Sequence, residues 1–185
     1  MEEEIMKFEE LFRRVSSEEF ANDFNVFELL EKDFYVVTNG GKEEYNSMIG
    51  SGGGFGFFLK KPTNWCLFKQ DRYTLELIKK YKKYTLSLYE EEDKKAILLL
   101  GQETGRNNNK MDKVKLTKIE TPTGNIVFEE AKLILECDLT AIIMPNKENF
   151  YSENSKKYIE EAYKDENEYR KIVYGEITNI WVKNK

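Results

Sequence analysis

Hydrophobic positions along this chain recur mainly with a period of two, the spacing at which side chains of a β-strand return to the same face. The run Tyr84–Tyr89 alternates strictly. In 132–144, Leu133, Leu135, Cys137 and Leu139 face one way, whereas Lys132, Glu136 and Asp138 do not. Further strands are predicted at 34–38, 45–50, 65–69, 115–121, 126–128 and 169–183, and Asn39-Gly40-Gly41 joins the first two as a hairpin.

Helical spacing is less common. Ser16-Ser17-Glu18-Glu19 is a capping box that predicts a helix to about Lys32, with Phe20, Phe24, Phe27 and Leu30 on its buried face. Shorter helices are predicted at 72–81, at 93–100 before a stop at Gly101, and within 148–165, while 2–15 fits a helix or an edge strand. Many strands and few helices predict a closed antiparallel barrel with peripheral helices, in one domain spanning 1–185.

Composition narrows the class of protein. The net charge of −5 argues against a nucleic-acid partner, and no apolar run reaches the roughly 18 residues that cross a membrane. Cys66 and Cys137 lie in apolar segments without metal-site spacing, so we expect buried, reduced thiols and no metal. Together with the lack of a signal-peptide pattern, this predicts a cytoplasmic protein.

The chain contains no histidine. This excludes the Ser–His and Cys–His nucleophile designs, most zinc sites and the commonest general base. No catalytic side chain can be singled out. If the protein is an enzyme, we expect its chemistry to belong to a bound cofactor.

Three polar or glycine-rich segments interrupt the apolar strands. In 46–56, glycines allow a ligand to approach the backbone, although neither a Walker loop nor a dinucleotide fingerprint is present. Asp71–Thr74 offers a guanidinium, a hydroxyl and a helix start to a phosphate, and Thr104-Gly105-Arg106, with Lys110 beyond it, repeats this chemistry. Each alone also fits an ordinary loop or a solvated helix cap. Together they predict a phosphorylated ligand.

These segments, in this order, resemble the flavin reductase-like family of FMN-binding split barrels, from about Phe34 to Val182. The resemblance is carried by short motifs along the chain: Tyr45–Met48 with Ser51 and Gly53–Gly56, Lys61-Pro62, Arg72-Tyr73-Thr74, Leu100-Gly101 with Thr104–Arg106, Phe128–Ala131 and Tyr174–Ile177. It implies a mainly β fold, a split antiparallel β-barrel of the FMN-binding type with peripheral helices.

The resemblance also implies a cofactor and roles. FMN is the expected cofactor, NADH or NADPH the expected electron donor, and a homodimer with flavin near its interface the expected assembly. Asn46, Ser47, Met48 and Ser51 would line the ring and ribityl chain, largely through backbone atoms. Arg72 and Thr74 would hold the phosphate, and Thr104, Gly105 and Arg106 would close over it. Gly52, Gly53 and Tyr73 complete the cofactor-binding set.

The chain departs from the family pattern at four positions. Gly52 replaces a Trp, Thr104 a Ser and Asn107 an Asp, and Arg170 or a neighbour stands where a His is common. A cation there can still favour a reduced, anionic flavin. Two alternatives therefore remain beside a reductase: a flavoredoxin-like FMN electron carrier without a direct nicotinamide site, and a ligand-free barrel that pairs with another protein.

Overall fold

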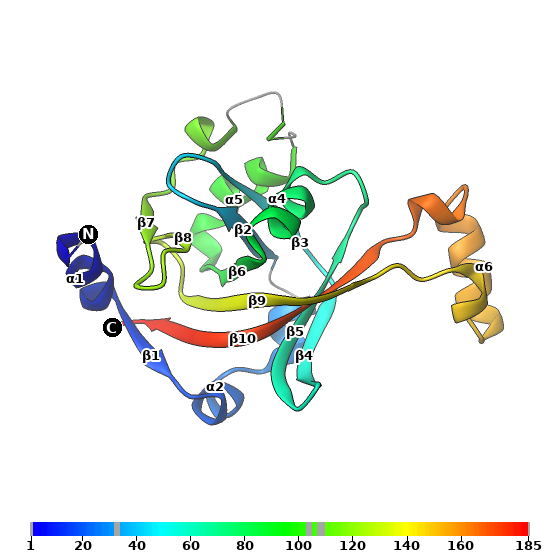
Figure 1. The fold of residues 1–185 in the computed structure, drawn as a ribbon, viewed down its shortest axis with the longest axis horizontal. Coiled ribbons are helices and arrows are strands. Elements are labelled where there is room, and N and C mark those ends of the chain that lie inside the picture. Colours follow the sequence, from blue (N-terminus) through cyan, green and yellow to red (C-terminus); the bar gives the residue numbers. More distant parts are fainter. Residues whose placement is uncertain (1, 32–33, 103–104, 107–109, 185) are drawn as a thin grey trace.

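The computed structural model describes residues 2–31, 34–102, 105–106 and 110–184 (Figure 1). Its strands are β1 (Phe12–Val15), β2 (Tyr35–Gly40), β3 (Tyr45–Gly50), β4 (Gly53–Phe58), β5 (Lys61–Phe68), β6 (Lys83–Leu88), β7 (Lys118–Glu120), β8 (Ile126–Phe128), β9 (Leu133–Ile143) and β10 (Lys171–Lys183). Its α-helices are α1 (Glu2–Leu11), α2 (Ser17–Asp23), α3 (Val26–Glu31), α4 (Tyr73–Tyr81), α5 (Lys94–Gln102) and α6 (Glu153–Ala162), and 3-10 turns cover Glu91–Asp93, Lys110–Lys113, Lys147–Asn149 and Glu166–Glu168.

The main sheet is antiparallel and is organised around β10. Its strand order is β3-β2-β6-β9-β10-β5-β4, and β1 also pairs with β10. The first half of β10 bonds to both β5 and β9, and its second half bonds to β9 and β1. Strands β7 and β8 form a separate hairpin. This arrangement confirms the predicted antiparallel, mainly β architecture.

The sheet does not close. The closed barrel expected from the alternation is therefore wrong, and the split barrel that the family resemblance implied is confirmed. Strands β3 and β4 follow each other in the chain, yet β3 pairs with β2 and β4 pairs with β5. Gly52 between them has a φ of +79° and Gly53, the first residue of β4, has a φ of +139°, and these angles direct the chain from one layer to the other. Both β3 and β4 therefore remain edge strands.

Both faces of the central strands are buried. On one face Leu86, Leu135 and Val173 lie in the barrel core, and on the other Ile134 and Trp181 pack with Phe8 of α1. Because each face has its own apolar cluster, β6 is buried along nearly its whole length rather than on alternate residues. The Leu133, Leu135 and Cys137 face predicted for the core is confirmed.

Glu136 points to the opposite face, as predicted, but that face is buried too. Its side chain is 1% exposed, and its carboxylate accepts hydrogen bonds from Thr121 Oγ1 (2.5 Å), Asn125 Nδ2 (2.6 Å) and Trp181 Nε1 (2.9 Å). These donors satisfy a carboxylate that would otherwise be costly to bury. They also attach the β7–β8 turn to β9.

The N-terminal region differs most from expectation. Residues 2–15 form both a helix and a strand. The single helix expected from Ser16 is two helices, because Phe24 is extended and Asn25 Oδ1 caps a new start by accepting from Phe27 N (3.1 Å). Ser16 does cap α2, but Glu19 pairs with Arg13 instead of completing the capping box. Phe27 is 84% exposed, and the side chain of Leu30 lies outside the described part.

Two glycine interpretations are also corrected. The segment 53–56, taken as part of a loop, forms most of strand β4. Gly101 does not end its helix but lies inside α5, where a Cβ would come within 3.3 Å of Ile49 Cδ1. The absence of a side chain at Gly101 therefore allows α5 to pack closely on β3.

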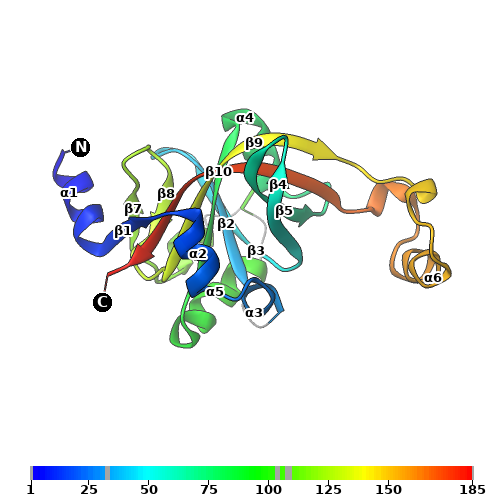
Figure 2. The ribbon, with the colours of Figure 1, turned by 90° about the horizontal axis from the view of Figure 1, so that it is seen from below.

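The ends of β9 and β10 extend well beyond the sheet and carry α6 (Figures 1 and 2). Residues 144–170 of this projection are called the arm below. Phe150 and Tyr163 of the arm contact Tyr169 edge-on, with ring centroids 5.8 and 5.4 Å apart. Across the described residues, no helix is both long and apolar enough to cross a membrane.

Candidate functional site

Asn46 connects the first two predicted segments. It lies on β3, is 3% exposed, and donates from Nδ2 to Thr74 Oγ1 of α4 (2.8 Å). Its Oδ1 has no hydrogen-bond partner among the described residues. Gly105 lies so close that a Cβ on it would be 2.0 Å from this oxygen. The third segment therefore meets the other two at one buried amide.

Arg106 attaches the third segment to α4. Its guanidinium binds both carboxylate oxygens of Glu76 (3.0 and 2.6 Å) and donates to Asp71 O (3.2 Å). It also lies over the ring of Tyr73, 5.7 Å from the centroid. The geometry holds Gly105 and Arg106 against the first turn of α4. Thr104, the remaining predicted member of this segment, lies outside the described residues.

The first turn of α4 leaves polar groups available. Arg72 occupies the N-cap position with an extended backbone and makes no side-chain capping bond. Within the described ranges its guanidinium has no hydrogen bond or ion pair. The first amides of an α-helix lack intrahelical acceptors, and a cation beside them makes an anion-binding environment. Thr74 is 1% exposed, and its hydroxyl is already bonded to Asn46.

The opposite end of β3 leads to the glycine turn. Ser51 is exposed, and the Tyr35 hydroxyl donates to Gly52 O (2.6 Å). A Cβ on Gly53 would lie 2.1 Å from Trp65 O, so only glycine fits there. Because β3 is an edge strand, its outer backbone groups have no strand partner. An edge of this kind can bind the polar rim of a flat ring.

Ser47 and Met48 point away from any ligand surface. The Ser47 hydroxyl is fully buried and bonds to Thr38 Oγ1 (2.8 Å), and Met48 is 7% exposed in the barrel core. Only the backbone of these two residues is available to a ligand. Lys110, mentioned with the third segment, is also buried and donates to Leu100 O (2.9 Å).

Glu44 is a member of the site that the sequence analysis missed. Its carboxylate accepts hydrogen bonds from Lys80, from the Tyr73 hydroxyl (2.7 Å) and from the Tyr81 hydroxyl (3.0 Å). The Lys80 bond first, and then the two tyrosines, lower the pKa of Glu44 to about 2. The sequence did contain a signal for this contact, because the spacing of Tyr73, Lys80 and Tyr81 places them on one face of α4.

The two cysteines are free and buried, as predicted. Burial raises the pKa of the Cys66 thiol to about 12 and also raises that of Cys137, so neither is an activated nucleophile. In the portion of the chain that the structure describes, no group of three His, Cys, Asp or Glu side chains is placed to hold a metal. The groups that the three segments bring together are amides, hydroxyls and guanidinium groups, which suit a phosphate and a polar ring.

Comparison with known proteins agrees with this chemistry. Residues 59–185, more than half of the chain, match the family described as the flavin reductase like domain. The protein therefore belongs to this family. No curated protein sequence matches the chain.

Several solved structures share the fold. A flavin reductase-like FMN-binding domain from Shewanella baltica has a TM-score of 0.65 at 12% identity, covering 92% of this chain and 76% of that one. A flavoredoxin of Desulfovibrio vulgaris (0.60, 17% identity, 81% and 68% covered) and an NADH:FAD oxidoreductase of Streptomyces globisporus (0.58, 15%, 82% and 78%) are also similar. At these identities the likeness shows the fold, and it confirms the split barrel.

The residues present fit a phosphorylated flavin. The Asn46 Oδ1 is a buried acceptor packed against Gly105, and the described residues supply no hydrogen-bond donor to it, which is the kind of group that a ligand can satisfy. The Arg72 guanidinium, near the uncapped first turn of α4, suits a phosphate. The outer edge of β3 separates these groups from the Ser51 turn by about five residues, roughly 16 Å of extended chain. An elongated ligand with a phosphate at one end matches this separation.

The Glu44 contacts predict an acid-sensitive attachment of α4. The pKa of Glu44 in the folded protein, about 2, lies below its ordinary 4.5, so its contribution to stability is complete above pH 4.5 and disappears as pH falls towards 2. We expect the free energy of unfolding of Glu44→Gln to be lower than wild type at pH 7 and to approach it over this window. Urea denaturation at a series of pH values measures this.

Glu43→Gln serves as the matched control, because Glu43 is the exposed neighbour of Glu44. The free energy of unfolding of this control should differ from that of wild type by the same amount at every pH. Parallel curves of the free energy of unfolding for Glu44→Gln and wild type from pH 7 to pH 2 would show that the contacts of Glu44 contribute nothing to stability.

Proposed function

We propose that the protein binds FMN and works as an oxidoreductase that passes electrons from NADH or NADPH to flavin, or through bound FMN to an acceptor. The observation that carries this proposal is the convergence of the three segments on Asn46, through its bond to Thr74 and its contact with Gly105. FMN supplies the hydride chemistry, which agrees with a chain that has no histidine.

In this proposal the phosphate binds at the start of α4. Arg72 offers a planar fork, and the first-turn amides of Tyr73 and Thr74 offer N–H donors. Asn46 orients the Thr74 hydroxyl. Gly105 and Arg106 close the site from the other side. The ion pair with Glu76 holds Arg106 in place for this role.

The ring of FMN lies along the outer edge of β3 and against Ser51, Gly52 and Gly53. Ser47 and Met48 take part through their backbone, since their side chains are buried in the protein. Edge amides and carbonyls match the alternating donors and acceptors of the ring rim. The protein then supplies the orientation of the ring and the electrostatic field around it, and FMN supplies the electrons.

A second function, an electron carrier without a nicotinamide site, is favoured by the turn after β3. Gly52 has φ of +79°, a conformation that disfavours the bulky aromatic residue that the family pattern has at this position. The flavin face beside Gly52 is therefore less covered. A flavoredoxin is among the proteins of similar fold, which supports this alternative.

Purified protein should be yellow and should consume NADH or NADPH. Removing the flavin and adding FMN at a hundredfold excess over its dissociation constant should stabilise the protein by about 2.7 kcal/mol, measured as a thermal shift. Stopped-flow mixing of the FMN-loaded protein with NADH, and separately with a reduced protein donor, distinguishes the two functions. Reduction by the protein donor alone would establish the carrier. A colourless protein without a thermal shift would instead indicate a ligand-free barrel.

Arg72→Ala should weaken FMN binding roughly 10- to 100-fold, because one charge-assisted contact to the phosphate is lost. Riboflavin has the same ring without the phosphate, so its affinity should change little. Fluorescence titration with both flavins measures this. Lys79→Ala, an exposed cation in the last turn of α4, is the control. An equal loss of affinity for FMN and for riboflavin in Arg72→Ala would show that Arg72 does not bind the phosphate.

We also propose a homodimer that forms through the arm. Ile143, Met144 and Tyr151 at or near the arm are 44%, 48% and 86% exposed, an uncovered apolar surface on a projecting element. Light scattering should give twice the mass of one chain, and Tyr151→Glu should shift the equilibrium towards monomer. Wild-type protein with the mass of one chain at all concentrations would refute the dimer.

A further inference from the structure

The first turn of α4 carries an acidic side chain at the place where the proposed function puts a phosphate. Glu76 lies in this turn, four residues after the N-cap residue Arg72. A carboxylate near the positive end of a helix stabilises the helix, but it occupies the same electrostatic environment that an anionic ligand uses. Glu76 therefore opposes the binding of a phosphate unless its charge is balanced.

Arg106 balances that charge. Its guanidinium binds both carboxylate oxygens of Glu76, at 3.0 and 2.6 Å, in the two-bond geometry in which an arginine pairs best with a carboxylate. The side chains of Arg106 and Glu76 are 44% and 49% exposed, so the pair lies at the surface beside the helix start rather than in the core. The pair as a whole carries no net charge.

The same contacts leave Arg106 poorly placed to bind a phosphate itself. A guanidinium binds an oxyanion best with two N–H groups on one edge. The edge formed by Nη1 and Nη2 is on Glu76, and Nη2 also donates to Asp71 O (3.2 Å). One face of the guanidinium lies over the Tyr73 ring, 5.7 Å from its centroid. The protein thus already engages the groups that a phosphate would need.

The aromatic ring under Arg106 is itself fixed. The Tyr73 hydroxyl donates to Glu44 (2.7 Å), and the Glu44 carboxylate also pairs with Lys80. Two carboxylates beside the helix therefore have a cation each, since Glu44 pairs with Lys80 and Glu76 pairs with Arg106. The position of Arg106 is set by protein groups before any ligand binds.

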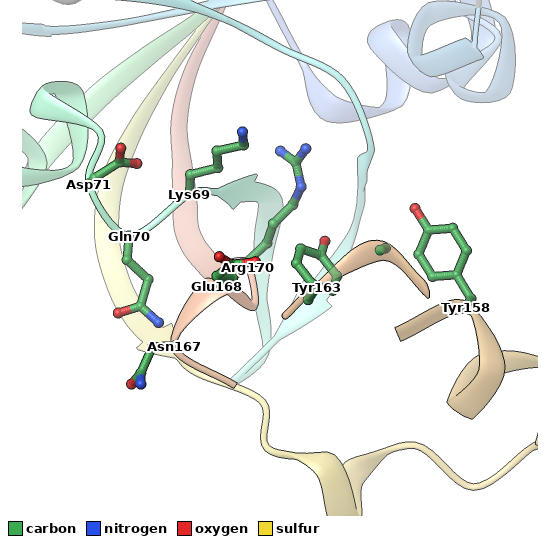
Figure 3. Close-up of a pocket in the computed structure, with 9 residues that line it drawn as sticks. Lys69, Gln70, Asp71, Tyr158, Tyr163, Asn167, Glu168 and Arg170 are labelled. Carbon is green, nitrogen blue, oxygen red and sulfur yellow. The ribbon is translucent and has the colours of Figure 1, made fainter. Parts of the chain in front are cut away.

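Arg72 is placed differently. Within the described ranges its guanidinium has no hydrogen bond or ion pair, and it stands at the N-cap of α4. The neighbouring carboxylate of Asp71 lines a pocket of about 470 Å³ between the arm and the connection from β5 to α4, together with Lys69 and Arg170 (Figure 3). Arg72 is therefore a cation at this helix start that no described carboxylate pairs with.

We propose that Arg106 is a positioning residue of the phosphate site, and that Glu76 determines how strongly the site prefers phosphorylated flavin. Arg106 acts by neutralising Glu76 at the start of α4, whereas Arg72 binds the phosphate directly. The inference rests on the proposed FMN site and deepens it, because it assigns direct recognition of the phosphate to one arginine rather than two.

The test is a double-variant cycle on the affinities of the flavin-free protein for FMN and for riboflavin, measured by fluorescence titration. The readout is the ratio of the two affinities, because a loosened fold or ring site weakens both flavins and leaves the ratio unchanged. In Arg106→Gln the unbalanced Glu76 carboxylate should lower the ratio roughly 5-fold. Glu76→Gln alone should raise the ratio, and the double variant, which lacks both charges, should return it to within about twofold of wild type.

Direct binding of the phosphate by Arg106 predicts a different pattern. The ratio would then be equally low in Arg106→Gln and in the double variant, and this result would overturn the proposal. An unchanged ratio in Arg106→Gln would overturn it too. Arg13→Gln with Glu19→Gln is the matched control, because this arginine–glutamate pair has similar exposure, 50% and 40%, but lies on β1 and α2. The control should leave the ratio unchanged.

Failure of the proposed function has its own signature. If the wild type binds FMN and the cycle gives a contrary pattern, only the inference fails. If the wild type binds neither flavin, the proposed function fails, and the same four proteins are titrated with inorganic pyrophosphate by calorimetry. Pyrophosphate affinity that falls in Arg106→Gln and recovers in the double variant supports the role of Glu76. Any other pattern, including no binding, overturns it.

Discussion

The pairing of β10 with three other strands is the constraint on which the rest of the structure depends. Its 13 residues bond to β9 along most of their length, to β5 in the first half and to β1 in the second. Register shifts near Gly175 and Thr178 turn the sheet at this strand. Gly175 cannot carry a side chain, because a Cβ would lie 2.4 Å from the Tyr84 hydroxyl. The pairing of β10 thus determines both the close packing across the barrel and its split shape.

The split leaves β3 as an edge strand, and the proposed cofactor site depends on the backbone groups of β3 that have no strand partner. A closed barrel would pair these backbone groups and leave none for a ligand. Helix α4 then places Thr74 on Asn46, and the bond to Glu76 holds Arg106 against α4. Three parts of the chain thereby meet at one place, and the proposed FMN site uses their backbone and polar groups.

The arm adds a surface that the barrel alone does not provide. It places Arg170 and two tyrosines in one pocket with Lys69, which follows β5.

Local patterns in the sequence determined most strands, helix α4, the buried thiols and the three polar segments. Alternation and capping depend on neighbours in the chain, so they can be read from it directly. The break at Phe24, the exposure of Phe27, the burial of Glu136 and the four-residue contact at Glu44 were decided only by the tertiary structure. The contacts of Glu136 and Glu44 depend on side chains far apart in sequence, and a buried carboxylate is stable only where distant donors such as Trp181 reach it.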